Sequence, residues 1–171
     1  VQRRAERDED AARRADELAK AADPRRGLRV GDVLLHIGDS LWLAGAIELD
    51  EEGTTIVLFR TPENTRASWV AQLDDEACEL ALLSESTEIP DGSIPDRLPV
   101  GGRLLSLSKR GRARVRTRGE HLPKIGATAR FTILSDVGGR MAIVIDFDGA
   151  PRLTLVGDRV ERALIDVLPG G

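Results

Sequence analysis

Arginine stands at every second position of one segment, from Arg110 to Arg118 in the stretch KRGRARVRTRG. Successive side chains of an extended strand point to opposite faces, so this spacing predicts a strand that carries all of these guanidinium groups on one face. Guanidinium groups bind carboxylates and phosphates through paired hydrogen bonds, and the chemistry expected of such a face is anion binding. We call the five residues the arginine ladder: Arg110, Arg112, Arg114, Arg116 and Arg118.

Two interpretations of the arginine ladder are open. In the first, which the sequence favours, the ladder is a solvated sheet face whose arginines pair with carboxylates on neighbouring strands, each pair contributing about 0.2 to 1 kcal/mol. The candidate carboxylates are Glu48, Asp50, Glu51, Asp74, Asp75, Asp146 and Asp148. In the second, the ladder binds an acidic protein surface. Nucleic acid is the less favoured partner, because the ladder lacks the interleaved aromatic side chains on which bases stack.

The two tryptophans have different expected roles. Trp69 begins an alternating apolar run and is predicted to lie in the core. Trp42 stands between Leu41 and Leu43, and if these leucines point inward then Trp42 points outward. An outward tryptophan often marks a binding surface; the alternative is that Trp42 covers the junction between the two halves of the chain or is covered by the N-terminal helix. Trp42 therefore joins the arginine ladder as a candidate interaction residue.

Residues that could support catalysis or bind a metal are sparse. Neither His36 nor His121 has a second histidine or a cysteine at metal-ligand spacing. We interpret His36 as structural and His121 as a loop residue without the partners that acid/base catalysis needs. The single cysteine, Cys78, has no nearby cation to favour its thiolate and is predicted to be a small buried apolar residue at the start of a strand. No nucleophile elbow or phosphate-binding loop motif occurs in the sequence. We therefore expect no catalytic residue, no metal site and no cofactor.

Composition limits the possible classes of protein. The chain has 171 residues, 41% of them hydrophobic, which suits one ordinary domain or two very small ones. Its formal net charge is −4, so any binding to a polyanion would have to be confined to a local basic patch of the surface. A single cysteine fits a reducing compartment and predicts a cytoplasmic location. No apolar run approaches the roughly 20 residues that span a bilayer, so membrane insertion is not expected.

The elements that must position these residues are mostly strands. Residues 1–22 predict a charged helix with a weak alanine stripe, ended by Pro24 and Gly27. Apolar runs cut by turn residues then predict strands at 32–37, 41–48, 54–60, 68–73 and 79–83, with a hairpin turn at Gly53. Near the end, 160–168 has helical spacing after a possible N-cap at Asp158, and we expect a short helix there, with a strand as the alternative for ALIDVL.

The two halves of the chain resemble each other. VGDVLL at 30–35 recurs as VGGRLL at 100–105, WVAQLD at 69–74 aligns with MAIVID at 141–146, and ACELALL at 77–83 aligns with APRLTLV at 150–156. This similarity predicts an internal duplication of a five-strand meander. Meanders of this size close into SH3-like barrels or pair into a shared sandwich. The expected fold class is therefore all-β, with an N-terminal helix and a short C-terminal helix.

The pattern also resembles a bacterial family known as domain of unknown function 4178. The resemblance covers about residues 28–168 and rests on the residues Gly31, Asp32, Gly38, Trp42, Gly45, Trp69 and Val70. The second half departs from it, because Arg112 and Met141 stand where the first half has its tryptophans. The resemblance implies an accessory role and supplies no established activity or catalytic residues that could be carried over.

These observations combine into one prediction. The chain divides into a charged helix and linker at 1–27, a first β-meander at 28–89, a proline-rich connector at 90–99 and a second β-meander with the C-terminal helix at 100–171. The expected function is non-enzymatic protein interaction through Trp42 and the arginine ladder, with an acidic or extended partner. Binding of a polyanion such as nucleic acid through the ladder is the alternative, and an enzyme with an unrecognised site is the third.

Overall fold

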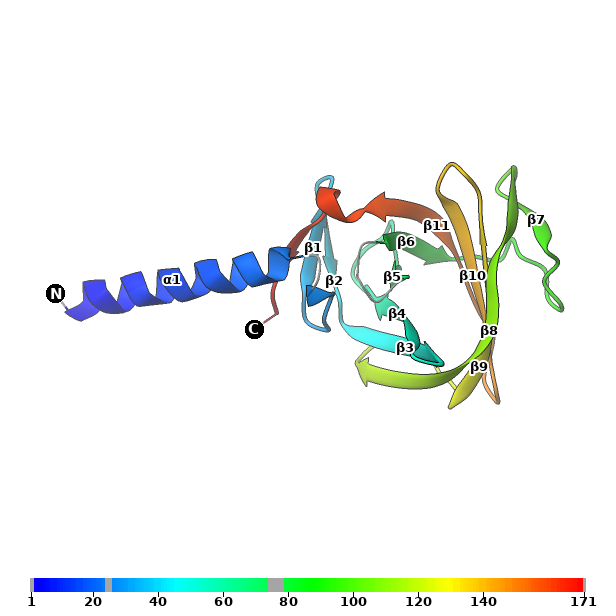
Figure 1. The fold of residues 1–171 in the computed structure, drawn as a ribbon, viewed down its shortest axis with the longest axis horizontal. Helices are drawn as coiled ribbons and strands as arrows, with labels where there is room; N and C mark the ends of the chain where they lie inside the picture. Colours follow the sequence, from blue (N-terminus) through cyan, green and yellow to red (C-terminus); the bar gives the residue numbers. More distant parts are fainter. Residues whose placement is uncertain (1, 24–25, 74–78, 171) are drawn as a thin grey trace.

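Strands dominate the computed structural model, which describes residues 2–23, 26–73 and 79–170 (Figure 1). The elements in chain order are α1 (Gln2–Ala22), β1 (Val33–His36), β2 (Asp39–Trp42), β3 (Gly45–Glu51), β4 (Thr54–Arg60), β5 (Trp69–Gln72), β6 (Glu79–Glu85), β7 (Arg97–Val100), β8 (Arg103–Gly119), β9 (Thr128–Ser135), β10 (Arg140–Phe147), β11 (Leu153–Glu161), a 3-10 turn (Arg162–Leu164) and β12 (Asp166–Leu168). The protein is thus mostly β with one N-terminal helix, as its sequence predicts.

Eight of the described strands close into one antiparallel barrel. Their order around the barrel is β3-β4-β5-β6-β11-β10-β9-β8, and pairing between β3 and β8 completes the ring. The short strand β7 extends the sheet beyond β8, and β12, β1 and β2 form a separate three-stranded sheet. Figure 1 shows this small sheet between the barrel and α1.

Each half of the chain contributes four consecutive strands to the barrel. Strands β3 to β6 come from the first half and β8 to β11 from the second, and the halves join twice, through β6–β11 and β3–β8. A four-strand meander alone would leave two edge strands with unpaired backbone groups, and joining the halves at both edges removes them. The halves therefore share one closed barrel, which differs from both the SH3-like barrels and the sandwich expected from the sequence. Their origin by duplication stays a prediction.

Apolar side chains from both halves fill the barrel interior. They include Leu58, Trp69, Phe131 and Ile143, each at most 1% exposed. Trp69 donates from Nε1 to Glu85 Oε1 at 3.3 Å, so its polar atom is satisfied although the ring is buried. The prediction of Trp69 as a core residue is confirmed.

Two further apolar clusters lie on the outer surface of the barrel. One packs beneath the three-stranded sheet and includes Leu34, Leu41 and Phe59. The other packs beneath β7 and the segment before it and includes Val100 and Leu134. The small sheet and β7 thus cover apolar patches of the barrel exterior, and the remaining exterior, over β8 to β10, carries charged side chains.

Helix α1 is attached to the rest of the molecule at its last turn. Ala21 is its buried residue, and the buried guanidinium of Arg162 donates to the main-chain oxygens of Ala21 at 3.2 Å and Ile165 at 2.9 Å. A cation at the carboxyl end of a helix also suits the helix dipole. The other turns project away from the barrel (Figure 1), and Leu18 is 45% exposed. The predicted helix over 1–22 is confirmed across its described residues.

The strand expected at 41–48 is two strands. The chain leaves the small sheet after Trp42 and enters the barrel at Gly45. Between them, Leu43 exchanges backbone hydrogen bonds with Gly31 and Asp32, while Ala44 donates to the carbonyl oxygen of Arg60. The apolar run at 41–47 is continuous because the small sheet and the barrel both bury it. Its sequence pattern therefore gives no sign that the chain passes from one sheet to the other.

The prediction of a C-terminal helix over 160–168 is wrong. Strand β11 continues to Glu161, a single 3-10 turn follows, and Asp166–Leu168 forms β12. Strand β12 pairs with β1, whose other edge is taken by β2, so it satisfies backbone groups that a helix would leave open. Ile165 and Val167 are buried while Asp166 is exposed, which is the alternation of a strand.

A buried carboxylate fixes the start of the first half. Asp32 is 1% exposed and accepts two hydrogen bonds from Arg26, at 2.7 and 3.0 Å. It also accepts from the backbone N–H groups of Arg29 at 2.8 Å and Gly170 at 3.3 Å. The hydrogen bond with Asp32 raises the pKa of the Arg26 guanidinium above its usual value. One side chain thus ties together the linker after α1, the start of β1 and the C-terminal segment.

Candidate anion-binding surface

The arginine ladder lies on the outer face of β8. Its five arginines are exposed, while the residues between them face the barrel, where Ala113 is buried and Val115 packs against the core. The prediction of a strand with all these arginines on one face is confirmed. Strand β8 is long and curved, and it pairs with β9 over its middle and with β3 over its end (Figure 1).

The two ends of the arginine ladder are held by carboxylates. Arg110 pairs with Asp96 at 3.3 Å and donates to the main-chain oxygen of Ile94 at 2.6 Å. Arg118 pairs with Glu48 of β3. These contacts agree with the solvated-face interpretation at these positions, although Asp96 was not among the expected carboxylates. Exposed pairs of this kind are each worth at most about 1 kcal/mol.

The middle of the arginine ladder is less neutralised. Arg112 lies 3.9 Å from Asp148, at the limit of an ion pair. Arg114 and Arg116 form no ion pair with any described residue, although Asp50 and Glu48 lie directly across from them on β3. Among the other expected carboxylates, Asp146 pairs with Arg152, and Asp74 and Asp75 lie outside the described residues. The middle arginines are therefore the ones available to a ligand.

Strand β9 adds an arginine that the sequence reasoning missed. Arg130 lies directly across from Arg112 on one side and from Asp146 on the other. It is exposed and forms no ion pair within the described part of the chain. The alternation Thr128, Arg130, Thr132 was the signal for an outward face, but its meaning depends on β9 pairing with β8. Thus two arginines of like charge stand side by side on neighbouring strands.

These arginines line a surface groove of about 710 Å³. One wall is the connector at 92–94, which two arginines hold in place. Arg152 donates to the main-chain oxygens of Gly92 at 2.7 Å and Pro90 at 3.4 Å, and Arg110 holds Ile94 as described. Arg152 also binds both carboxylate oxygens of Asp146, at 2.5 and 3.1 Å. The guanidinium groups of Arg110 and Arg152 are therefore bound to the connector and to carboxylates. Arg112 and Arg130 also line the groove but hold no part of the connector in the described chain.

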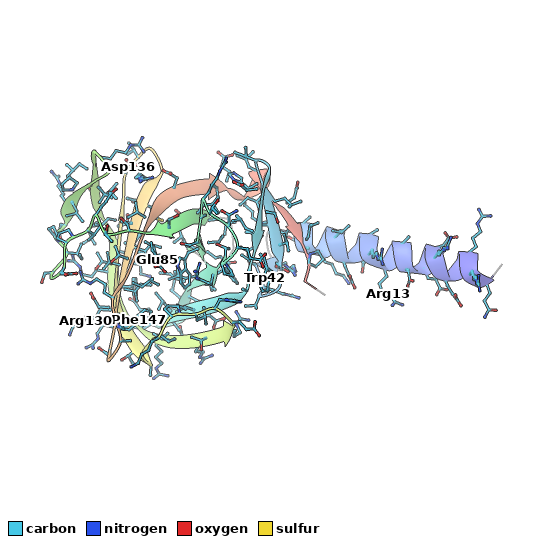
Figure 2. The ribbon with its side chains drawn as sticks, turned by 180° about the vertical axis from the view of Figure 1, so that it is seen from behind. Arg13, Trp42, Glu85, Arg130, Asp136 and Phe147 are labelled. Carbon is cyan, nitrogen blue, oxygen red and sulfur yellow. The ribbon has the colours of Figure 1, made fainter. Side chains whose placement is uncertain are left out.

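Trp42 lies near the other end of the arginine ladder. It is half-buried at the end of β2, and its ring meets that of His121 edge-on with centroids 6.0 Å apart. His121 follows β8, and the N–H of its neighbour Glu120 donates to the carbonyl oxygen of Ala44 at 2.9 Å. Figure 2 shows Trp42 on the helix side of the barrel and Arg130 on the opposite side. The candidate surface is therefore elongated.

The remaining candidate residues lie apart from this surface or outside the described chain. His36 is half-buried at the end of β1, and His121 is exposed beside Trp42. Cys78 lies outside the described residues. In the described ranges, no group of histidine, cysteine and acidic residues is arranged to hold a metal ion. No helix in these ranges is both long and apolar enough to span a membrane.

Comparison with known proteins adds no identification. No family model, no curated protein and no solved structure matches this chain. The resemblance to domain of unknown function 4178 therefore stays a prediction.

Proposed function

We propose that the protein is a non-enzymatic interaction module that binds an extended acidic segment of another protein along the arginine ladder. The observation that carries this proposal is the row of exposed guanidinium groups on β8, of which Arg114 and Arg116 have no ion-pair partner among the described residues. Buried side chains fill the barrel interior, so a ligand meets the outer surface. Arginine side chains projecting from a rigid sheet are preorganised for carboxylates, because the strand already fixes their spacing.

The dimensions of the arginine ladder suit an extended peptide. Arg110 and Arg118 are eight positions apart on one strand, which is about 27 Å at about 3.4 Å per residue. An extended segment of about eight residues covers this length and places every second side chain over the arginines. Trp42 with His121 lies beyond Arg118 and offers an aromatic contact at the end of the segment. This geometry favours acidic residues at alternate positions.

Acidic residues beside the arginine ladder favour a protein over nucleic acid. Glu48, Asp50 and Asp148 border the arginines, so a continuous phosphate backbone would lie against these carboxylates. A peptide can place its acidic residues over arginines and neutral residues over carboxylates. The aromatic platforms that single-stranded nucleic acid uses do not interleave with the ladder. Nucleic acid binding is therefore one outcome of the test rather than the expectation.

Selection from a library of random peptides displayed on phage tests this proposal. We expect the wild-type protein to enrich sequences with acidic residues at every second position, and the double variant Arg114→Ser, Arg116→Ser to lose this enrichment. The matched control is Arg103→Ser, Arg159→Ser, which removes two exposed arginines paired elsewhere with Asp136 and Glu79. Equal enrichment by all three proteins would overturn the proposal.

A salt titration separates the two classes of partner. An oligonucleotide that contacts several phosphates should lose affinity by orders of magnitude between low and physiological salt. A short acidic peptide with an aromatic contact should lose much less. Tight binding of an oligonucleotide, with no selected peptide, would replace the proposed function by polyanion binding.

A further inference from the structure

The cross-strand pair of Arg112 and Arg130 is unfavourable in the protein alone. The two residues are directly opposite on β8 and β9, and both side chains are exposed on the same face. Opposite residues of antiparallel strands have Cβ atoms about 5 Å apart, and like charges at this position destabilise the sheet. Carboxylates lie close by but leave the pair largely uncompensated: Asp146 is bound by Arg152, and Asp148 accepts from the Thr128 hydroxyl and is 3.9 Å from Arg112. An anion placed between the two guanidinium groups would offset this repulsion.

The groove around this pair is built from fixed parts. Its floor is the barrel sheet, and its wall at 92–94 is held through main-chain oxygens by Arg110 and Arg152. The groove volume of about 710 Å³ exceeds what a single tetrahedral anion needs, so the group bearing the anion can enter with it.

We infer that Arg112 and Arg130 form a binding site for the dianion of a phosphate monoester. One carboxylate has two oxygens and a single charge, and a single guanidinium fork satisfies it. Two adjacent guanidinium groups present twice the donors and twice the charge. A phosphate monoester supplies three acceptor oxygens and a charge between about −1.5 and −2 at neutral pH, which matches both. The shared chemistry is the monoester, carried either by a phosphorylated side chain or by a free small molecule.

The inference deepens the proposed function, because Arg112 belongs to the arginine ladder. It rests on that function only if the phosphate is carried by a bound protein segment rather than by a free small molecule. Calorimetric titration of the full chain with three probes tests it. The probes are free phosphoserine, an eight-residue acidic peptide, and the same peptide carrying one phosphoserine. We expect the phosphopeptide to bind at least about tenfold more tightly than the unphosphorylated peptide, since charge-assisted hydrogen bonds are gained.

Two double variants separate this site from the rest of the arginine ladder. Arg112→Gln, Arg130→Gln should abolish the gain from phosphorylation, so that the two peptides bind equally, and both should bind more weakly than to the wild type because Arg112 belongs to the arginine ladder. Arg114→Gln, Arg116→Gln should keep the gain and weaken both peptides equally. Binding of free phosphoserine as tight as that of the phosphopeptide would assign the site to a small molecule. If phosphorylation gives no gain while the acidic peptide still binds, this inference is overturned and the proposed function survives.

Thermal unfolding gives a readout that needs no partner. In phosphate-free buffer, Arg112→Gln, Arg130→Gln should raise the melting temperature by about 1 to 3 °C, because it removes the like-charge pair. In inorganic phosphate the wild-type protein should gain stability and this variant should not. A variant that is less stable than the wild type in phosphate-free buffer, and that gains equally from phosphate, would contradict the assignment.

Discussion

Glu48 lies directly across from Arg116, yet its carboxylate pairs with Arg118. This diagonal contact occupies the last arginine of the ladder and leaves Arg116 without an ion pair in the described chain. A ligand that uses the whole ladder must therefore compete with Glu48 for Arg118. Under the proposed function, Glu48 therefore limits the affinity for a ligand at the end of the ladder nearest Trp42.

Glu48→Gln should strengthen binding of an acidic peptide. The substitution keeps the size of the side chain, removes one negative charge and releases Arg118, so we expect affinity to rise about two- to five-fold. Stability should change by less than about 1 kcal/mol, because Arg118 is half-exposed. Calorimetric titration and chemical unfolding measure the two effects. A loss of peptide affinity would show that Glu48 helps to form the surface.

Asp32→Asn should be strongly destabilising. Asp32 is almost fully buried and binds Arg26 through both carboxylate oxygens, so the amide leaves a cation that is 11% exposed without its partner. Breaking such a pair costs about 3 to 5 kcal/mol. Urea unfolding measures the change, and Asp39→Asn, which removes an exposed pair with Arg66, is the control. Similar small losses of stability in both variants would contradict the role of Asp32 in tying together the linker, β1 and the C-terminal segment.

Ile37→Asn should stabilise the protein. Ile37 has φ of 46° at the tip of the β1–β2 hairpin and is 80% exposed, so a β-branched residue adopts a left-handed conformation without gaining burial. Asparagine is a preferred residue before glycine in such turns, and we expect about 1 kcal/mol of added stability. Val137→Asn is the control, because Val137 is an exposed turn residue whose φ is not positive. A loss of stability in Ile37→Asn would mean that the Ile37 side chain makes stabilising apolar contacts in solution.

Gly157→Ala should damage the junction between the halves. Gly157 is on β11, opposite Leu83 of β6, and an added methyl group would collide with the main-chain oxygen of Leu82. Because backbone stands in the way, relief requires separating β6 from β11, at a cost of about 1 to 3 kcal/mol. In Gly138→Ala the nearest atom belongs to the flexible side chain of Arg103, and no backbone atom is among the three nearest, so little change is expected. Thermal unfolding distinguishes the two variants.

Local patterns predicted the strands well where turn residues mark their ends. The expected strand at 54–60 coincides with β4, and Gly53 has the positive φ that its hairpin turn needs. The arginine ladder followed from period-2 spacing, because alternation alone decides which face a side chain occupies. Trp69 was predicted as core for the same reason. These properties depend on neighbours along the chain.

Features that depend on pairing between distant segments were not predictable from the sequence. The apolar residues of 160–168 fit a helix as well as a strand, and the open edge of β1 decides between them. Arg130 became a site residue only because β9 pairs with β8 in a register that places it beside Arg112. Closure of the barrel likewise depends on pairing of β3 with β8, which are far apart in the chain.

The most direct test of the proposed function uses tryptophan fluorescence. Trp69 is fully buried and Trp42 is half-buried near the end of the arginine ladder, so a segment lying along the ladder should change the emission of Trp42 alone. Titrating the wild-type protein with an eight-residue peptide acidic at alternate positions should give a saturable change. That change should vanish in Trp42→Phe and weaken at least about tenfold in Arg114→Ser, Arg116→Ser. An unchanged titration curve in the arginine variant would contradict binding along the ladder.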